Sequence, residues 1–138
     1  MREELAKFPE MVLKKFAFLV RDYGFRAVGE EAGLVRMESP TLGVLTVFDP
    51  RGELDVWVFR LGSESPLDSW TYTGMTGRAS LHRLLEIAGE QMLDDPRLLQ
   101  GDPTFFSRLG ADNRRRSREL TAWASGKGPR PDTRKLPG

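Results

Sequence analysis

The ionisable side chains of this chain offer little for enzyme chemistry. Its one histidine, His82, stands near the start of a predicted helix, and an isolated histidine is more often a surface side chain than a catalytic base or a metal ligand. There is no cysteine, so a thiolate nucleophile and the common zinc sites are excluded, although carboxylates alone could hold magnesium. No spacing marks an acid and base pair. We therefore expect no catalytic residue, no cofactor and no metal.

Asp55 is the carboxylate whose position stands out. It lies in the middle of a predicted strand, two residues before Trp57, where an unpaired charge would be costly to bury. We expect it to pair with Arg36 across the sheet or to face solvent at an edge. The alternative is a pocket around Asp55 and Trp70 that binds a small molecule or performs catalysis. Glu38 and Glu53 are weaker candidates for such a role.

A glycine-rich segment, residues 74–78 (GMTGR), precedes a predicted helix and faintly suggests a phosphate-binding loop, because helix N-terminal amides attract anions. It lacks the lysine and the length of a P-loop. An ordinary glycine-rich connection is the favoured interpretation.

Four arginines form the strongest nucleic-acid signal: Arg114, Arg115, Arg116 and Arg118. Residues 113–138 hold eight basic and two acidic side chains, a surplus of six, whereas residues 1–112 hold thirteen basic and eighteen acidic ones, a deficit of five. Asp112 could cap a last helix that ends near Trp123, which would place the arginines in an unfavourable first turn and invite an anionic partner. The lack of interleaved aromatic residues favours a solvated basic face instead.

These residues need elements to position them, and the first is an amphipathic helix over residues 9–23. Its apolar positions recur at three- and four-residue steps, and Pro9 suits a first helical turn. Gly24 suits the left-handed residue that follows a helix.

Short β-like runs follow: FRAVGE, LVRMES, LGVLTVF and ELDVWVFRL. Their short connections cannot hold crossover helices, so we expect an antiparallel meander of four or five strands, with Trp70 and Tyr72 in a further strand or a packed loop. The sequence Asp49-Pro50-Arg51-Gly52 favours a type I turn followed by a left-handed residue. In that register Leu45 lies opposite Trp57 and Gly43 lies beneath Phe59, on one face, while Val44 pairs with Val58 on the other.

Helices dominate the predicted C-terminal part. Ser80 could cap a helix with an apolar stripe, and Asp95-Pro96 and Asp102-Pro103 each read as a cap followed by proline. Residues 1–124 are predicted to form a single α+β domain and residues 125–138 a flexible, disordered basic tail.

Both faces of the predicted hairpin carry apolar residues, so the covering of each face decides their role. We expect the helix over residues 9–23 to cover one face, and the segment 81–123 either to cover the other or to pack at an edge. In the first case Trp57 and Phe59 are core residues, which we favour. In the second they form an exposed patch of the kind that marks a binding surface.

The N-terminus, MREELAKFPE, lacks the apolar core of a signal peptide, and no apolar run approaches the roughly 18 residues of a membrane span. We therefore expect a soluble, cytoplasmic protein with no membrane partner.

Residues 8–62 resemble small bacterial α+β proteins, many of which look like the immunity proteins of polymorphic toxin systems. The resemblance rests on Phe16, Leu19, the sequence YGF at 23–25, the sequence VRMESP at 35–40 and the paired strands that end at Leu61-Gly62. It implies stoichiometric binding of a partner protein through an acidic or aromatic surface. The residues that would do so are Trp57, Phe59, Asp55, Glu53, Arg36 and Glu38.

The leading interpretation is thus a non-enzymatic protein-binding module, an immunity-type or accessory protein. The alternative is a nucleic-acid-binding accessory protein that acts through the arginine cluster. The long basic C-terminal part departs from the pattern of the resembling proteins.

Overall fold

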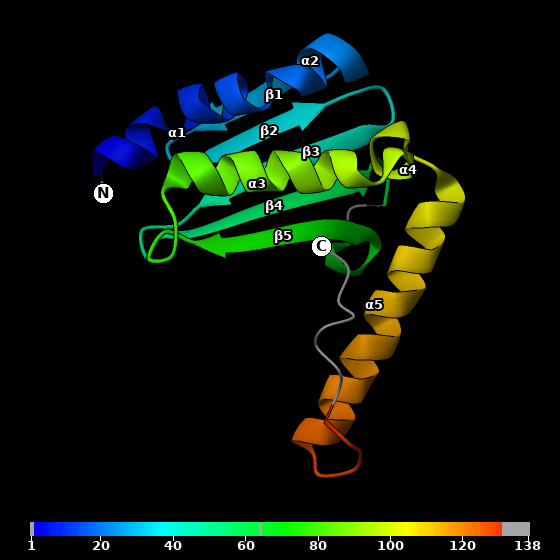
Figure 1. Cartoon of the computed structure of the whole chain (residues 1–138). Coiled ribbons are helices and arrows are strands. Elements are labelled where there is room, and N and C mark those ends of the chain that lie inside the picture. The colour runs from blue at the N-terminus through cyan, green and yellow to red at the C-terminus, as the bar shows by residue number, and fades with distance from the viewer. Residues whose placement is uncertain (1, 64, 131–138) are drawn as a thin grey trace.

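A computed structural model describes residues 2–63 and 65–130 (Figure 1). The strands are β1 (Arg26–Glu31), β2 (Leu34–Glu38), β3 (Leu42–Phe48), β4 (Glu53–Arg60) and β5 (Ser69–Met75). The helices are α1 (Arg2–Lys15), α2 (Ala17–Tyr23), α3 (Leu81–Asp94), α4 (Pro96–Gln100) and α5 (Pro103–Ala124), with a short 3-10 helix η1 (Pro66–Asp68) before β5. This is the expected α+β fold.

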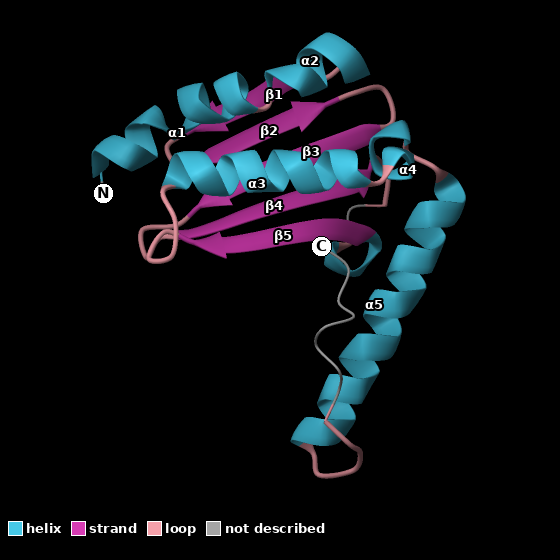
Figure 2. Ribbon diagram, in the orientation of Figure 1, coloured by secondary structure: helices cyan, strands magenta, loops and turns pink. Residues whose placement is uncertain are grey.

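The five strands form one antiparallel meander in the order β1-β2-β3-β4-β5 (Figure 2). The predicted register of the β3–β4 hairpin is confirmed, with Val44 opposite Val58, Leu45 opposite Trp57 and Gly43 opposite Phe59. Its turn is also as predicted. The amide of Gly52 (φ 95°) donates to the carbonyl of Asp49 at 3.0 Å, and the Asp49 carboxylate accepts from the amides of Arg51 and Glu53.

Strand β1 is one edge of the sheet, and its pairing with β2 is irregular. The register shifts between Ala27 and Gly29, which leaves Val28 43% exposed. The strand also ends in two exposed glutamates, Glu30 and Glu31.

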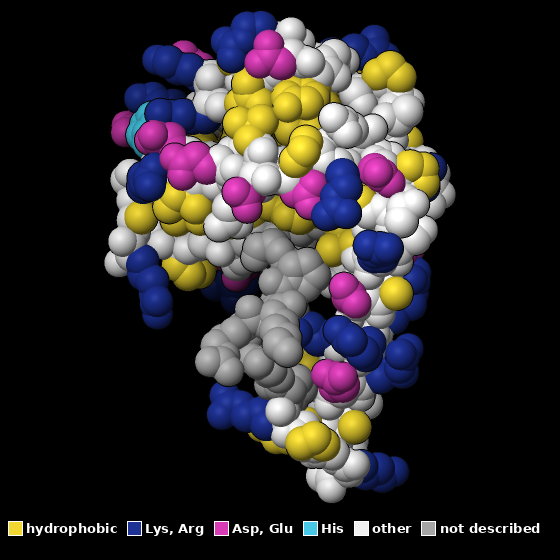
Figure 3. Space-filling view, turned by 45° about the vertical axis from the view of Figure 1, so that its right-hand side comes forward, with side chains coloured by type: hydrophobic (Ala, Val, Ile, Leu, Met, Phe, Trp, Pro, Cys, Tyr) yellow, Lys and Arg dark blue, Asp and Glu magenta, His cyan; other side chains and the backbone are white. Residues whose placement is uncertain are grey.

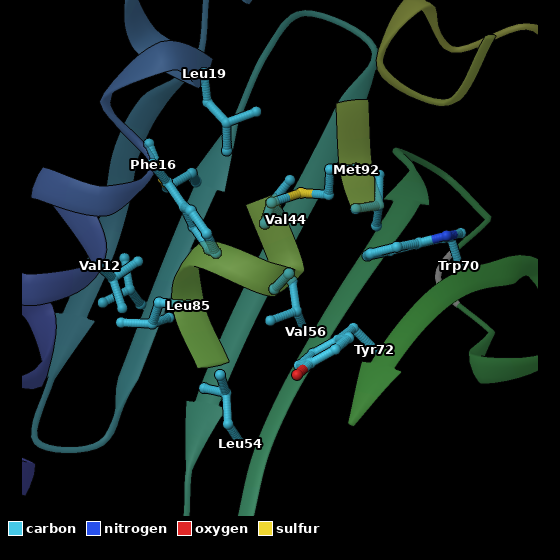
Figure 4. Close-up of a cluster of buried hydrophobic side chains, with 14 of the residues drawn as sticks. Val12, Phe16, Leu19, Val44, Leu54, Val56, Trp70, Tyr72, Leu85 and Met92 are labelled. Carbon is cyan, nitrogen blue, oxygen red and sulfur yellow. The ribbon is translucent and has the colours of Figure 1, made fainter. Parts of the chain in front are cut away.

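The core lies between the sheet and three helices on one of its faces, α1, α2 and α3. Figure 4 shows side chains from these helices meeting side chains of β3, β4 and β5. Trp70 and Tyr72 belong to this core, at 6% and 8% exposed. Helix α3 lies beside α1 on the same face, where Lys15 and Glu86 form an ion pair at 3.5 Å (Figure 1). We call this covered side of the sheet the helix face.

The prediction of one helix over residues 9–23 is wrong in two respects, because the helix starts earlier and is interrupted. Helix α1 begins at Arg2, and Pro9 lies inside it. A proline lacks the N–H that would bond to the carbonyl four residues earlier. That carbonyl, on Leu5, instead accepts the amide of Gly33 from the β1–β2 turn at 3.0 Å. The helix is then interrupted at Phe16 (φ −104°, ψ 23°), and α2 continues to Tyr23, where Gly24 (φ 72°) ends it as expected.

The predicted caps of the later helices are confirmed. Ser80 accepts the amide of Arg83, and Asp95 and Asp102 cap α4 and α5 ahead of their prolines. The predicted cap at Asp112 is wrong, because α5 runs without interruption from Pro103 to Ala124. Within this helix Asp112 forms an ion pair with Arg115 at 3.6 Å, one turn further on.

The fully buried residues of α5 all lie in its first half. Phe106, Leu109 and Gly110 are buried against the body, where α5 contacts η1 and β5. The second half extends away from the sheet (Figures 1 and 3), and Leu120 and Trp123 are largely exposed.

The predicted disordered tail begins in a folded turn. The amide of Lys127 donates to the carbonyl of Ala122 at 2.7 Å, Gly126 is left-handed (φ 72°), and the Arg130 guanidinium lies over the Trp123 ring. Residues 131–138 of the predicted tail lie outside the described residues. Within the described part, no helix is long and apolar enough to cross a membrane.

Candidate functional site

The side of the sheet opposite the helix face is covered by no α-helix of the described residues and is bordered by the 3-10 helix η1. We call it the reverse face. Along each strand its side chains alternate with those of the core. On β2, β3 and β4 it comprises Leu34, Arg36, Glu38, Gly43, Leu45, Val47, Glu53, Asp55, Trp57 and Phe59. All six predicted partner-binding residues lie on it, so the structure brings them to one surface.

A shallow depression of about 230 Å³ opens on this face. We call it the Trp57 hollow. Its lining consists of Arg36, Leu45, Trp57, Phe59, Ser65, Pro66 and Ser69. Trp57 is partly buried, which leaves some of its indole ring accessible, and Leu45 lies directly opposite it on β3. A large aromatic side chain in this state is the usual anchor of a protein interface.

Phe59 forms the floor of the hollow. It is 5% exposed because the guanidinium of Arg36 lies 5.0 Å above its ring and Gly43 lies beneath it. A Cβ atom at position 43 would overlap that ring, as the register predicted. The two alternatives for these aromatic residues, a core position or an exposed patch, therefore apply to different residues. Phe59 is buried as a core residue would be, and Trp57 is partly open.

Arg36 pairs with Glu38 at 2.8 Å, both within β2. Neither predicted arrangement of Asp55 is formed, because it does not pair with Arg36 and because its strand, β4, is not an edge of the sheet. Asp55 instead accepts the hydroxyl of Thr73, its cross-strand neighbour on β5, at 2.7 Å. Arg36 and Asp55 lie too far apart along their strands to meet, because Arg36 is level with Trp57.

Glu53 and Asp55 lie on one face of β4 and make one end of the reverse face acidic. Hydrogen bonding to the Asp55 carboxylate, and then repulsion by its charge, raise the pKa of Glu53. Beside them, the backbone amide of Glu53 holds the pKa of Asp49 below its usual value. A cation placed over Glu53 and Asp55 would relieve the repulsion between them.

The proposed pocket around Asp55 and Trp70 is not formed. Trp70 is level with Val58 and lies in the core on the helix face, whereas Asp55 lies on the reverse face. The sheet separates the two side chains.

The wall of the Trp57 hollow comes from η1, and sequence reasoning missed it. Ser65, Pro66 and Ser69 line the hollow, and Ser69 donates its hydroxyl to the carbonyl of Pro66 at 2.7 Å. The turn-forming composition of residues 62–69 predicts a loop but not its position. Leu45, in contrast, could have been found from the alternation that selected Trp57.

The arginine cluster is divided between two sides of α5. Successive helical residues are turned by about 100°, so Arg114, Arg115 and Arg118 lie within one arc of about 100°, and Arg116 points away from it. Arg114 pairs with Asp68 of η1 at 2.5 Å, Arg115 pairs with Asp112, and Arg116 is partly buried. Figure 3 shows basic side chains on more than one side of this part of α5, with acidic ones among them.

The other chemical candidates are scattered. His82 is exposed at the start of α3, and the segment 74–78 is the end of β5 followed by a turn in which the amide of Arg78 bonds to the carbonyl of Met75. Among the described residues, no three histidine, aspartate or glutamate side chains gather closely enough to hold a metal ion. Comparison of the chain with protein-family models, curated proteins and solved structures finds no match.

Proposed function

We propose that this protein is a non-enzymatic protein-binding module that holds a partner protein stoichiometrically on its reverse face. The observation that carries the proposal is the Trp57 hollow, an apolar depression with a partly open indole ring on a sheet face that no α-helix of the described residues covers. Residues 8–62 resemble small bacterial proteins, many of which look like immunity proteins, and immunity proteins act by such binding.

The two ends of the reverse face determine which side chains the partner presents. An apolar side chain would enter the hollow between Trp57, Leu45 and Pro66. A lysine or arginine would lie over Glu53 and Asp55, where the carboxylates repel each other. Since residues rise about 3.4 Å each along a strand, Asp55 lies roughly 7 Å from Trp57. The partner therefore presents an apolar and a basic side chain about that far apart.

Nucleic-acid binding through the arginine cluster has weaker support. Arg114 pairs with Asp68, and Arg115 pairs with Asp112 and Glu119. A nucleic-acid site would need these charges to neutralise phosphates in place of carboxylates.

The test is capture of the partner from the native host by the full chain, followed by a measured affinity. Trp57→Ala should abolish capture while the circular dichroism spectrum stays native. Leu93→Ala is the matched control, because Leu93 is a large apolar residue, 47% exposed, that lies on α3 away from the reverse face. Glu53→Lys with Asp55→Lys should also abolish capture.

Equal loss with Leu93→Ala and Trp57→Ala would mean that capture is nonspecific and would overturn the proposal. Retention of the partner by folded Trp57→Ala would overturn it as well. If nucleic acid is recovered instead, and its binding weakens when the four arginines are neutralised, the alternative function is correct.

A further inference from the structure

The short helix η1 makes different contacts on its two sides. Pro66, with the flanking Ser65 and Ser69, lines the Trp57 hollow. The other side of the segment, Leu67 and Asp68, contacts α5. The segment that forms the wall of the hollow thus also contacts the long C-terminal helix α5.

Three residues of α5 make this contact, and their spacing places them on one side of the helix: Gly110, Asn113 and Arg114. The side-chain amide of Asn113 donates to the carbonyl of Leu67 at 2.9 Å and to that of Ser69 at 3.4 Å. The guanidinium of Arg114 bonds to the Asp68 carboxylate at 2.5 Å. Gly110 allows the approach, since a Cβ atom there would collide with that carboxylate.

Resting on the proposed function of the reverse face, we propose that Asn113 and Arg114 are positioning residues of the partner-binding site. They act through η1, whose position determines the shape of the Trp57 hollow. Arg114 therefore serves the sheet face, although its sequence neighbours suggested nucleic-acid binding. Neither residue lines the hollow itself.

The proposal differs from a general stabilising role in what it predicts. Arg114 and Asp68 are a largely surface pair, and such pairs contribute little to global stability. Loss of the pair should therefore leave the unfolding midpoint nearly unchanged while it alters the surroundings of Trp57.

The experiment uses the full chain labelled with 5-fluorotryptophan, in which Trp57, Trp70 and Trp123 give separate fluorine signals, assigned by single Trp→Phe variants. The variant Asn113→Ala with Arg114→Ala should shift or broaden the Trp57 signal and leave that of Trp123 unchanged. Arg118→Ala is the matched control, one helical turn beyond Arg114 and without a hydrogen bond to η1 among the described residues.

A second variant tests the inference in case the double alanine variant does not fold. Gly110→Ala removes no polar group and favours the helix, because alanine has the higher helix propensity. It should nevertheless displace Asp68 and shift the Trp57 signal. Exchange of the charges, Asp68→Arg with Arg114→Asp, should restore the wild-type signal. An unchanged Trp57 signal in both Gly110→Ala and the double alanine variant would overturn the inference.

Partner binding provides the functional arm. The double alanine variant should bind the captured partner about fivefold more weakly, the change produced by about 1 kcal/mol, and Arg118→Ala should bind it normally. If the double alanine variant shifts the Trp57 signal but Trp57→Ala still captures the partner, the positioning role is upheld and the proposed function is refuted. If the Trp57 signal does not shift but Trp57→Ala abolishes capture, only the positioning role is refuted.

Discussion

The guanidinium of Arg36 covers the ring of Phe59, with 5.0 Å between its carbon and the ring centre. Because Gly43 also lies against the ring and residues of the η1 segment line the hollow beside it, Phe59 is enclosed although no α-helix of the described residues covers its side of the sheet. A cation over an aromatic face is attracted by the ring quadrupole. The reverse face therefore has a buried floor, and Trp57 is the aromatic residue left for contact.

This difference predicts unequal stability effects at the two aromatic positions. Phe59→Ala should lower the free energy of unfolding by about 3–5 kcal/mol, the range for a buried phenylalanine. Trp57→Ala should cost clearly less, because part of its ring is already in contact with solvent. Urea unfolding of both variants measures the difference. A larger loss for Trp57→Ala would remove Trp57 from the contact surface.

Gly43→Ala should destabilise the fold by about 1–3 kcal/mol, since the added methyl group overlaps the Phe59 ring and forces it to move. The double variant Gly43→Ala with Phe59→Leu should recover part of the loss relative to the sum of the two single changes. Thermal unfolding of the four chains forms the cycle that measures this coupling. Strict additivity would show that the two residues do not compete for space.

The raised pKa of Glu53 predicts a pH-dependent effect on stability. A carboxyl group whose pKa is higher in the folded state stabilises the fold at low pH, and that contribution is lost as pH rises through the folded pKa. Glu53→Gln should therefore gain stability relative to wild type as pH rises above about 4.3, the ordinary pKa of glutamate. Urea unfolding of both chains between acid and neutral pH gives the difference, with Glu30→Gln on β1 as the control. A difference that is independent of pH would contradict the repulsion between Glu53 and Asp55.

Thr46→Val should stabilise the protein by about 1 kcal/mol. Thr46 is 1% exposed on the helix face between Val35 and Val56, and its hydroxyl oxygen has no hydrogen-bond partner among the described residues. Valine has nearly the same shape without the buried polar atom. The unfolding midpoint should rise for Thr46→Val and stay unchanged for Thr71→Val on the reverse face. A lower midpoint for Thr46→Val would show that its hydroxyl is bonded.

Much of the sheet could be predicted because its signals are local. The Asp49-Pro50-Arg51-Gly52 turn fixes the hairpin register, and the register places Trp57 and the other candidates on one face. The alternation of side chains then identifies that face without further information.

The rest depended on contacts between distant segments. Pro9 suggested a helix start because its missing N–H costs nothing in a first turn. Inside α1 the proline leaves the carbonyl of Leu5 without a helical partner, and the amide of Gly33, on a turn of the sheet, bonds to it instead. The contact between Arg114 of α5 and Asp68 of η1 joins residues 46 positions apart in the chain, and the proposed role of Arg114 rests on it. No local pattern in either segment indicates that the two should meet.

The irregular edge strand β1 has a consequence for solubility at high concentration. A regular edge would expose a row of amides and carbonyls to which a sheet of another molecule could add, and an open aromatic face nearby would strengthen the stacking. The shift at Ala27/Gly29 and the adjacent Glu30 and Glu31 oppose such growth. The edge of the sheet thus resists the addition of another strand while the proposed binding face beside it stays open.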